Sequence, residues 1–211
     1  MEQLTMDDIA MKLKDRPIGV IGKRREYSVL MPLVERDGKI CFLFEVRSQD
    51  IAQPGDVCFP GGRIEEGETA TEAAIRETEE EMGLKREDID VFGRFDSMLE
   101  VGRIVMHTVV ARIDESALGS MSPDSEVREW FTVPLDFFAQ NKPDYHPIPI
   151  IQSTENFPFE KHGIDPDYRW RKAYSDTFFW HYEGHLIWGL TAGIVEWFME
   201  KIMNVSFGSF K

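Results

Sequence analysis

The chain of 211 residues is 42% hydrophobic and carries a formal net charge of −14 at pH 7. This length and composition allow one sizeable hydrophobic core, so we expect a single domain with additions. The strongly negative charge argues against nucleic acids and anionic membranes as partners, because both attract basic surfaces.

The N-terminal region predicts no signal peptide, because no apolar run follows the first residues. Residues 1–14 instead favour a short polar helix with Thr5 as its N-cap. The most apolar late stretch, 186–205, contains three charged residues, which indicates an amphipathic or buried helix and not a membrane span. Cys41 and Cys58 lie in apolar, strand-like runs and are expected to be buried thiols. These features indicate a cytoplasmic protein.

Strand-like and helix-like segments alternate along the chain. The first two strands are predicted at 27–34 and 39–46, joined by a turn that ends at Gly38. A loop and a helix follow over 55–83. The remaining predicted elements are strands at 90–95, 104–113 and 127–133, a short helix from Pro134, a hairpin over 179–188 and a C-terminal helix after Trp188. This order is typical of an α/β fold, in which a mixed sheet lies between helices.

We divide the chain into an N-terminal helical extension, residues 1–26, and a main domain, residues 27–211. Within the main domain, residues 140–171 contain several prolines and charges of both signs, which predicts an irregular insertion. Long ordered loops are often functional, so this insertion is a candidate cap over a substrate pocket.

The helix expected inside 55–83 has clear start and end signals. Thr69 or Thr71 can cap its N-terminus, and Glu72 follows Thr69 at the spacing of a capping box. Alanines in the first turns favour the helical conformation. Gly83 stands where a left-handed residue commonly ends a helix.

Glutamates crowd the last turns of this helix. Glu77 and Glu81 are one turn apart and Glu80 follows Glu77 by three residues, so the three can share a face. Negative side chains at a helix C-terminus oppose the helix dipole, at a cost of roughly 0.3–1 kcal/mol each. Three converging carboxylates suit a hard divalent cation such as Mg²⁺, which binds carboxylates, waters and phosphate oxygens. For the glutamates alone, a solvated charged helix is the alternative interpretation.

The whole segment 62–84 follows the pattern G-x5-E-x7-R-E-U-x-E-E-x-G-U and therefore resembles the Nudix box. The matching positions are Gly62, Glu68, Arg76, Glu77, Glu80, Glu81, Gly83 and Leu84. The one departure is Thr78, which stands where a bulky aliphatic residue is usual and still offers a methyl group. The resemblance implies the Nudix α/β/α sandwich with a mixed β-sheet. It also implies a hydrolase that uses Mg²⁺ or Mn²⁺ to cleave a diphosphate linked to another moiety.

The position of each residue in the box implies its role. Glu77 and Glu81 are expected to be direct metal ligands. Glu80 is expected to be either a further ligand or the base that takes a proton from the attacking water. The backbone carbonyl of Gly61, directly before the box, is an additional expected ligand.

Two more charged groups are assigned by the same resemblance. Arg76 belongs to the catalytic set and can pair with Glu68 or Glu80, which would hold the carboxylates in place. Nudix enzymes often use another acid from outside the box. Glu126 is the candidate here, because its surroundings, S-E-V-R-E-W-F-T-V-P, resemble an E-V-x-E-x-F-x-V-P-L pattern of the family.

The residues before the box resemble those of coenzyme A pyrophosphatases, which show R-S, then a glycine, then F-P-G-G. Arg47, Ser48, Phe59 and Gly62 match this pattern and are the expected substrate-binding residues. Ala52 departs from it, because the family usually carries a second arginine near this position. An arginine can hold a phosphate through two hydrogen bonds, so its absence bears on recognition of the 3′-phosphate of coenzyme A.

A second string, I-W-G-x-T-A at 187–192, also resembles coenzyme A pyrophosphatases. The resemblance implies hydrolysis of coenzyme A, or a derivative, to 4′-phosphopantetheine and adenosine 3′,5′-bisphosphate. The partner is then a small molecule with a diphosphate-linked nucleoside. Cleavage of ADP-ribose, dinucleotides or nucleoside triphosphates is the alternative within the enzyme class. A non-catalytic nucleotide-binding Nudix module is the alternative of another class, and a homodimer through the C-terminal helix stays open.

Overall fold

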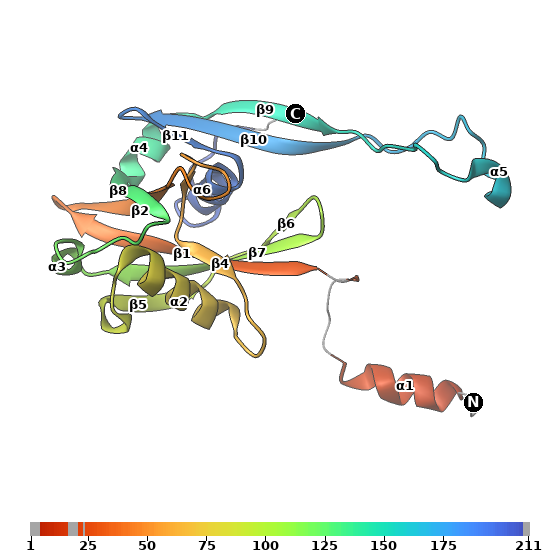
Figure 1. Ribbon diagram of the computed structural model, residues 1–211, viewed down its shortest axis with the longest axis horizontal. Coiled ribbons are helices and arrows are strands. Elements are labelled where there is room, and N and C mark those ends of the chain that lie inside the picture. Colours follow the sequence, from red (N-terminus) through yellow and green to blue (C-terminus); the bar gives the residue numbers. More distant parts are fainter. Residues whose placement is uncertain (1–4, 17–20, 23, 209–211) are drawn as a thin grey trace.

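The computed structural model describes residues 5–16, 21–22 and 24–208, so parts of the predicted N-terminal extension lie outside the described residues. Within the predicted extension, α1 (Met6–Lys14) stands apart from the rest of the molecule (Figure 1), whereas residues 25 and 26 already belong to the first strand of the main sheet. Thr5 caps this helix as predicted, and a capping box pairs it with Asp8. No helix among the described residues is long and apolar enough to cross a membrane.

The centre of the molecule is a mixed eight-stranded sheet. Its strands are β1 (Arg25–Arg36), β2 (Lys39–Arg47), β3 (Val57–Cys58), β4 (Gly61–Arg63), β5 (Ile89–Arg94), β6 (Met98–Glu100), β7 (Ile104–Ile113) and β8 (Val127–Pro134). The order is β3-β2-β1-β7-β5, with β4 paired to β1, β6 to β7 and β8 to β2. The long pair β1 and β7 is parallel and the other pairs are antiparallel.

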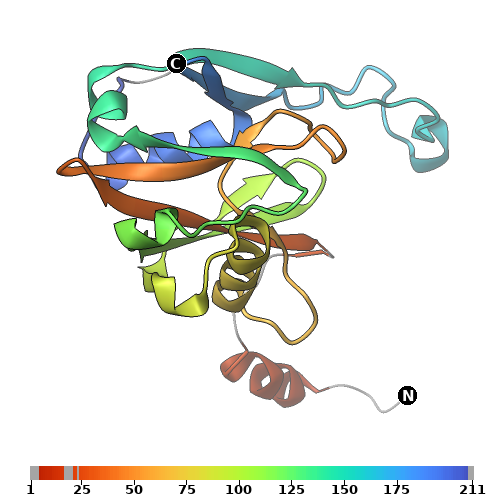
Figure 2. The same cartoon turned by 60° about the vertical axis from the view of Figure 1, so that its left-hand side comes forward.

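Helices cover both faces of this sheet. One face carries α2 (Ala70–Met82) and α3 (Glu115–Leu118), and a single 3-10 turn (Arg86–Asp88) follows α2. The other face carries α6 (Gly189–Lys201) and α4 (Leu135–Gln140), together with a second sheet of β9 (Asp144–Ile150), β10 (Ala173–Tyr182) and β11 (His185–Trp188). Figures 1 and 2 show α2 and α6 on opposite sides of the sheet. These layers confirm the predicted α/β/α sandwich with a mixed sheet.

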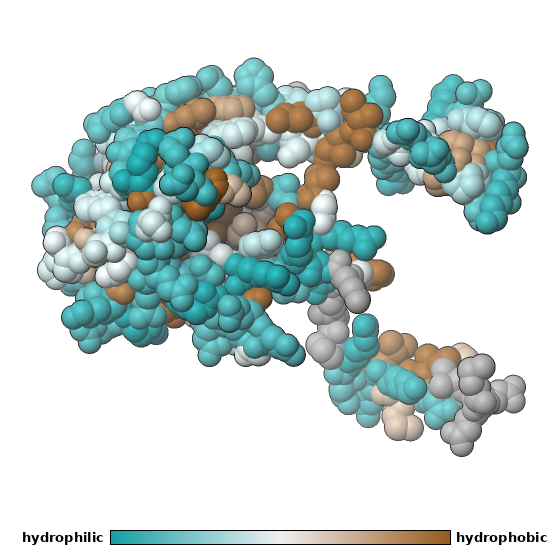
Figure 3. Space-filling model, in the orientation of Figure 1, coloured by the Kyte–Doolittle hydropathy of each residue, from teal (hydrophilic) through white to brown (hydrophobic). Residues whose placement is uncertain are grey.

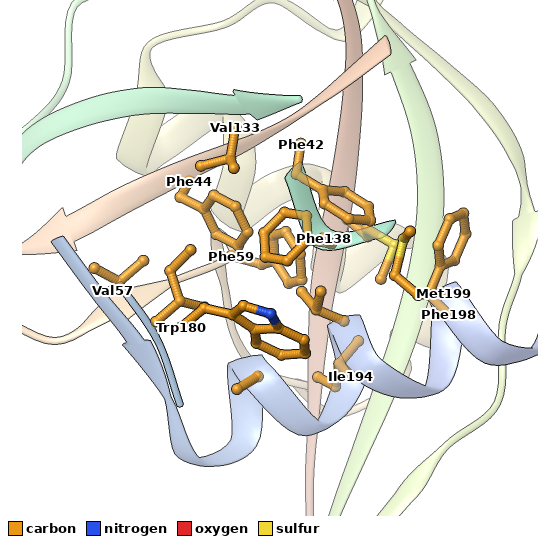
Figure 4. Close-up of a cluster of buried hydrophobic side chains, with 14 of the residues drawn as sticks. Phe42, Phe44, Val57, Phe59, Val133, Phe138, Trp180, Ile194, Phe198 and Met199 are labelled. Atoms are coloured by element: carbon orange, nitrogen blue, oxygen red, sulfur yellow. The ribbon is translucent and has the colours of Figure 1, made fainter. Parts of the chain in front are cut away.

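Alternation along the central strands divides the buried side chains between the two faces. Leu30 and Leu43 pack with α2 in one cluster, whereas Met31 and Phe42 pack with α6 in the other. The α6 side is rich in aromatic rings (Figure 4), and Phe42 contacts Phe198 of α6 edge to face. Because neighbouring strand residues point to opposite faces, both cores follow from one apolar strand pattern.

Most elements predicted from the sequence are confirmed, including the strands of the main sheet over 27–46 and 90–133, the hairpin over 179–188 and the helix after Trp188. The prediction of an irregular segment over 140–171 is wrong in part. This segment begins with β9, which pairs with β10 and contains Pro147 and Pro149. A strand with two prolines is tolerated because β9 is an edge strand, where one side needs no hydrogen-bond donors.

The β9–β10 arm, residues 144–182, extends from the body and ends at α5 (Phe159–His162). Figures 1 and 2 show its far end projecting away from the sandwich. Aromatic side chains pack on one another there, for example Phe157 against Trp170 with ring centroids 5.6 Å apart. The far end of the segment therefore lies away from the described sheet and not over it.

Candidate active site

The helix α2 positions the glutamates of the predicted box. Thr69 is its N-cap, and its hydroxyl accepts a hydrogen bond from the backbone N–H of Glu72. Gly83 ends the helix in the left-handed conformation, with φ 66°. Thr78, which departs from the usual aliphatic residue, is buried and donates its hydroxyl hydrogen bond to the carbonyl of Ala74 at 2.7 Å. Its polar group is therefore satisfied inside the helix, so the methyl group can face the core.

Arg76 links three carboxylates of the box. Its Nε and Nη2 atoms donate to the two oxygens of Glu68 at 2.9 and 3.1 Å. Its Nη1 atom donates to Glu77 at 2.9 Å and to Glu80 at 3.3 Å. The predicted pairing with Glu68 or Glu80 is thus confirmed for both. Glu68, followed by Glu77, raises the pKa of the Arg76 guanidinium, so this side chain stays charged.

Glu81 lies deep in the site, with 6% of its surface exposed. Its Oε2 atom accepts a hydrogen bond of 2.7 Å from the backbone N–H of Gly61 on β4. The Glu77 carboxylate lies beside Gly62, because a Cβ atom on Gly62 would come within 2.3 Å of Glu77 Oε1. Gly62 therefore lets β4 approach the Glu77 carboxylate of α2, and Gly61 lets β4 approach the backbone of β1 while its N–H binds Glu81.

Burial changes the protonation of these acids. It raises the pKa of Glu81 to about 9, and the nearby charge of Glu45 adds to the effect. Burial also raises the pKa of Glu77, although Arg76 opposes this. Carboxylates that resist ionisation in this way favour a bound cation, because a positive charge stabilises the ionised form.

Glu45 is a component of the site that sequence reasoning missed. It lies on β2 with 1% of its surface exposed, and burial raises its pKa to about 7. The Cys58 thiol donates to its Oε1 atom at 3.2 Å, while Oε2 has no hydrogen-bond partner among the described residues. A signal was present in the sequence, because Glu45 interrupts the apolar run 42–46. Cys41 is buried as predicted, and Cys58 is only partly buried.

Glu80 is more exposed than Glu77 and Glu81. Its side chain is 60% exposed and is bound by the same Arg76 Nη1 atom that binds Glu77. Among the described residues, no group of three or more histidine, cysteine, aspartate or glutamate side chains is arranged to hold a metal ion. The three carboxylates of α2 are therefore not gathered at one point, because Glu77 and Glu80 both bind Arg76, and their role as metal ligands stays a prediction.

The expected substrate-binding residues differ in their burial and in their hydrogen-bond partners. Arg47 Nε donates to the carbonyl of Ala52 at 2.9 Å, which closes the loop between β2 and β3. The backbone N–H of Ser48 donates to the carbonyl of Glu126 at 2.7 Å, while the Ser48 hydroxyl is buried without a partner in the described part of the chain. Phe59 is corrected to a core residue, because it is 3% exposed and stacks on Phe44.

Glu126, the expected additional acid, is exposed on the segment before β8. Its backbone contacts Ser48, so it lies beside the loop that follows β2. It lies at the surface near the expected substrate-binding residues, and its charge helps to raise the pKa of Glu45, so its role as an additional acid stays a prediction. The site as a whole offers one buried carboxylate, Glu81, and one half-buried carboxylate, Glu77, on α2 beside the glycines of β4.

The chain is similar in sequence to known proteins and to a family model. A family model described as the NUDIX domain matches residues 24–151. The peroxisomal coenzyme A diphosphatase NUDT7 of Mus musculus is 33% identical over 159 residues, which cover 72% of this chain and 66% of that protein. Nudix hydrolase 3 of Caenorhabditis elegans is 37% identical over 152 residues, which cover 66% of this chain and 62% of that protein. These matches span slightly less than two thirds of either relative.

A longer match is found with the uncharacterized Nudix hydrolase NudL of Citrobacter koseri, which is 29% identical over 196 residues. This match covers 91% of the chain and 92% of that protein. With 196 residues it is longer than the region 24–151 that the domain model matches.

Proposed function

The chain belongs to the NUDIX domain family, and on that premise we propose that it is a Mg²⁺- or Mn²⁺-dependent diphosphatase whose substrate is coenzyme A or a derivative of it. The observation that carries the proposal is the placement of Glu77 and Glu81 against the glycine strand β4. The name of the mouse relative, a coenzyme A diphosphatase, supports the choice of substrate. The R-S and F-P-G-G residues before the box support it as well.

The residues present suit a divalent ion. Glu77 and Glu81 would bind it through carboxylate oxygens, and the carbonyl of Gly61 is the proposed third protein ligand. Two carboxylates and a carbonyl leave room for waters and substrate phosphate oxygens, the shell that Mg²⁺ prefers. When bound, the ion would neutralise phosphate oxygens and lower the pKa of a water.

The side chains around the ion have distinct tasks in this proposal. Arg76 fixes the direction of Glu77 through a hydrogen bond of 2.9 Å, so it positions a ligand without binding the ion itself. The exposed carboxylate of Glu80 is free to move toward the substrate side as a further ligand or as the proton acceptor. Glu45 adds a buried negative charge beside Glu81 and increases the local preference for a cation.

Substrate recognition is assigned to the loop between β2 and β3 and its neighbour Glu126. The Arg47 side chain holds this loop through the carbonyl of Ala52, so the loop is ordered before the substrate binds. The unpartnered hydroxyl of Ser48 is a hydrogen-bond donor for a phosphate or an amide of the ligand. The chain has alanine at position 52, so the 3′-phosphate of coenzyme A would need another cationic partner.

Two other functions are considered, one catalytic and one not. Hydrolysis of ADP-ribose, dinucleotides or nucleoside triphosphates would use the same carboxylates with other recognition residues. A non-catalytic nucleotide-binding module would need no ionised Glu77 or Glu81. The presence of Glu77, Glu80 and Glu81 favours catalysis over binding alone.

A product assay distinguishes these functions. The purified protein would be incubated with Mg²⁺ or Mn²⁺ and, separately, with coenzyme A, dephospho-coenzyme A, ADP-ribose and NADH, and the products would be separated by chromatography. We expect coenzyme A to release adenosine 3′,5′-bisphosphate faster than the other compounds release their nucleotides. Faster cleavage of ADP-ribose or NADH would support the diphosphatase reaction and reject coenzyme A as the preferred substrate. Binding of these compounds without turnover would reject the proposed enzymatic activity and favour the non-catalytic binding module.

A further inference from the structure

A cavity of about 370 Å³ lies on the α6 face of the main sheet, away from α2. Its walls come from the segment around β6, from β9 and β10, and from α6. Apolar side chains that line it include Phe95, Met98, Phe178 and Trp197. In Figure 3, brown hydrophobic side chains gather between the β9–β10 arm and the β6 hairpin. A cavity of this size and apolar character is within the range of small-molecule sites.

The polar side of the cavity is acidic. Asp96 and Glu100 line it from the β6 segment, Asp176 from β10 and Glu196 from α6. No lysine, arginine or histidine is among the described residues that line it. Because the whole chain also carries a charge of −14, this cavity repels anions such as a diphosphate and attracts cations.

Two of these acids already have partners from aromatic side chains. Asp96 Oδ2 accepts a hydrogen bond of 2.7 Å from the indole of Trp197, and Asp176 Oδ1 accepts one of 2.6 Å from the Tyr145 hydroxyl. These bonds hold both carboxylates beside the cavity, and each carboxylate has a second oxygen that can accept a donor from a ligand.

Glu196 differs from the other acids because it is buried. It is 8% exposed, and in the described part of the chain its carboxylate has no hydrogen bond or ion pair. Burial, followed by the charge of Glu200, raises its pKa. The carboxylate oxygens of Glu196 are not among the fully enclosed, unpartnered atoms of the described residues, so they reach the cavity and can accept a donor from a ligand.

Trp197 adds a surface for cations. The ammonium group of Lys201 lies 4.0 Å from the centroid of its ring, on the same helix, and also binds Glu200. This contact is a cation–π interaction that occupies one face of the indole. The Trp197 side chain also contributes to the wall of the cavity.

We propose that this cavity binds an aliphatic polyamine, with one ammonium group on Glu196 and another on the rim acids Asp96 or Asp176. The acids come from separate elements with apolar side chains between them, which matches charged amines separated by methylene segments. A divalent metal ion fits less well, because it needs several oxygens converging on one point. The site is separate from the carboxylates of α2 and does not depend on the diphosphatase activity.

Calorimetric titration with spermidine tests the proposal. The full chain would be titrated at physiological salt, beside the variants Glu196→Gln and Glu115→Gln. Glu115 is an exposed acid on α3 at the opposite face, so its variant changes the net charge equally without touching the cavity. We expect Glu196→Gln to weaken spermidine binding by about tenfold, the loss typical of a charged hydrogen bond, and Glu115→Gln to leave it unchanged.

Other outcomes would overturn the proposal. The first is the absence of any heat of binding at millimolar spermidine. The second is equal weakening of spermidine binding in Glu196→Gln and Glu115→Gln. The third is competition between Mg²⁺ and spermidine that disappears in Glu196→Gln, which would indicate a metal site. Loss of spermidine binding in Glu81→Gln but not in Glu196→Gln would place the amine at the carboxylates of α2 and would also reject the proposal. If circular dichroism shows that Glu196→Gln is unfolded, Asp176→Asn serves as the second variant with the same expected weakening.

Discussion

Replacing Gly62 by alanine tests whether the Glu77 carboxylate must lie where the structure places it. A Cβ atom at Gly62 would lie 2.3 Å from Glu77 Oε1 and 2.4 Å from its Cδ atom. Since comfortable non-bonded contacts are about 3.5 Å, the carboxylate has to move by roughly 1 Å. Only the flexible end of a side chain is displaced, so the fold should tolerate the change.

The expected effect is large on activity and small on stability. A displacement of about 1 Å among catalytic groups costs on the order of 100-fold in rate. This corresponds to about 2.7 kcal/mol of transition-state stabilisation. We therefore expect kcat/KM of Gly62→Ala to fall about 100-fold, while Tm stays within about 2 °C of the parent protein.

The neighbouring Gly61→Ala provides the matched control. Its Cβ atom would lie 2.3 Å from the carbonyl oxygen of Ser28 and 2.6 Å from Cα of Val29, both backbone atoms of β1. Gly61 also has φ of 155°, which favours glycine. Overpacking and backbone strain together should cost about 3 kcal/mol. We expect a decrease in Tm of roughly 6–12 °C.

Both variants would be assayed for substrate cleavage at saturating Mg²⁺ and for thermal unfolding by circular dichroism. Parental kcat/KM in Gly62→Ala would refute the assignment of Glu77 as a metal ligand. An unchanged Tm in Gly61→Ala would instead refute the close pairing of β4 with β1.

Three further predictions concern the charged groups of the site. Glu81→Gln and Glu80→Gln should each lower turnover by about 100-fold or more without changing the circular dichroism spectrum, and near-parental rates in both would reject the metal site. Burial raises the pKa of Glu45 to about 7 and of Glu81 to about 9 from an ordinary 4.5, so the folded chain retains protons that the unfolded chain releases. The free energy of unfolding in urea should therefore fall as pH rises from about 5 to 9. The fall should be less steep with Mg²⁺ bound or in Glu45→Gln, and an equal slope in Glu45→Gln would contradict this. Arg76→Lys should reduce kcat about tenfold, since lysine cannot bridge two carboxylates through a planar fork, and an unchanged kcat would argue against a positioning role.

Sequence reasoning succeeded where structure depends on neighbours along the chain. The start of α2 at Thr69, its end at Gly83 and the pairing of Arg76 with Glu68 all follow from residues within a few turns of one another. The hairpin over 179–188 and its helix were predictable for the same reason. Regions whose structure depends on distant partners were harder, as β9 shows, because its prolines are tolerated only at the edge of a sheet.

The sequence by itself determined the identity and spacing of the box residues and the helix that carries them, since helix periodicity and capping are short-range effects. Only the tertiary structure decided which glutamates face inward. Glu81 meets β4 and becomes buried, whereas Glu80 stays exposed and pairs with Arg76. The tertiary structure also brought Glu45 toward Glu81, because burial and electrostatic coupling depend on how strands pack on a helix. No pattern within a single segment contains that information.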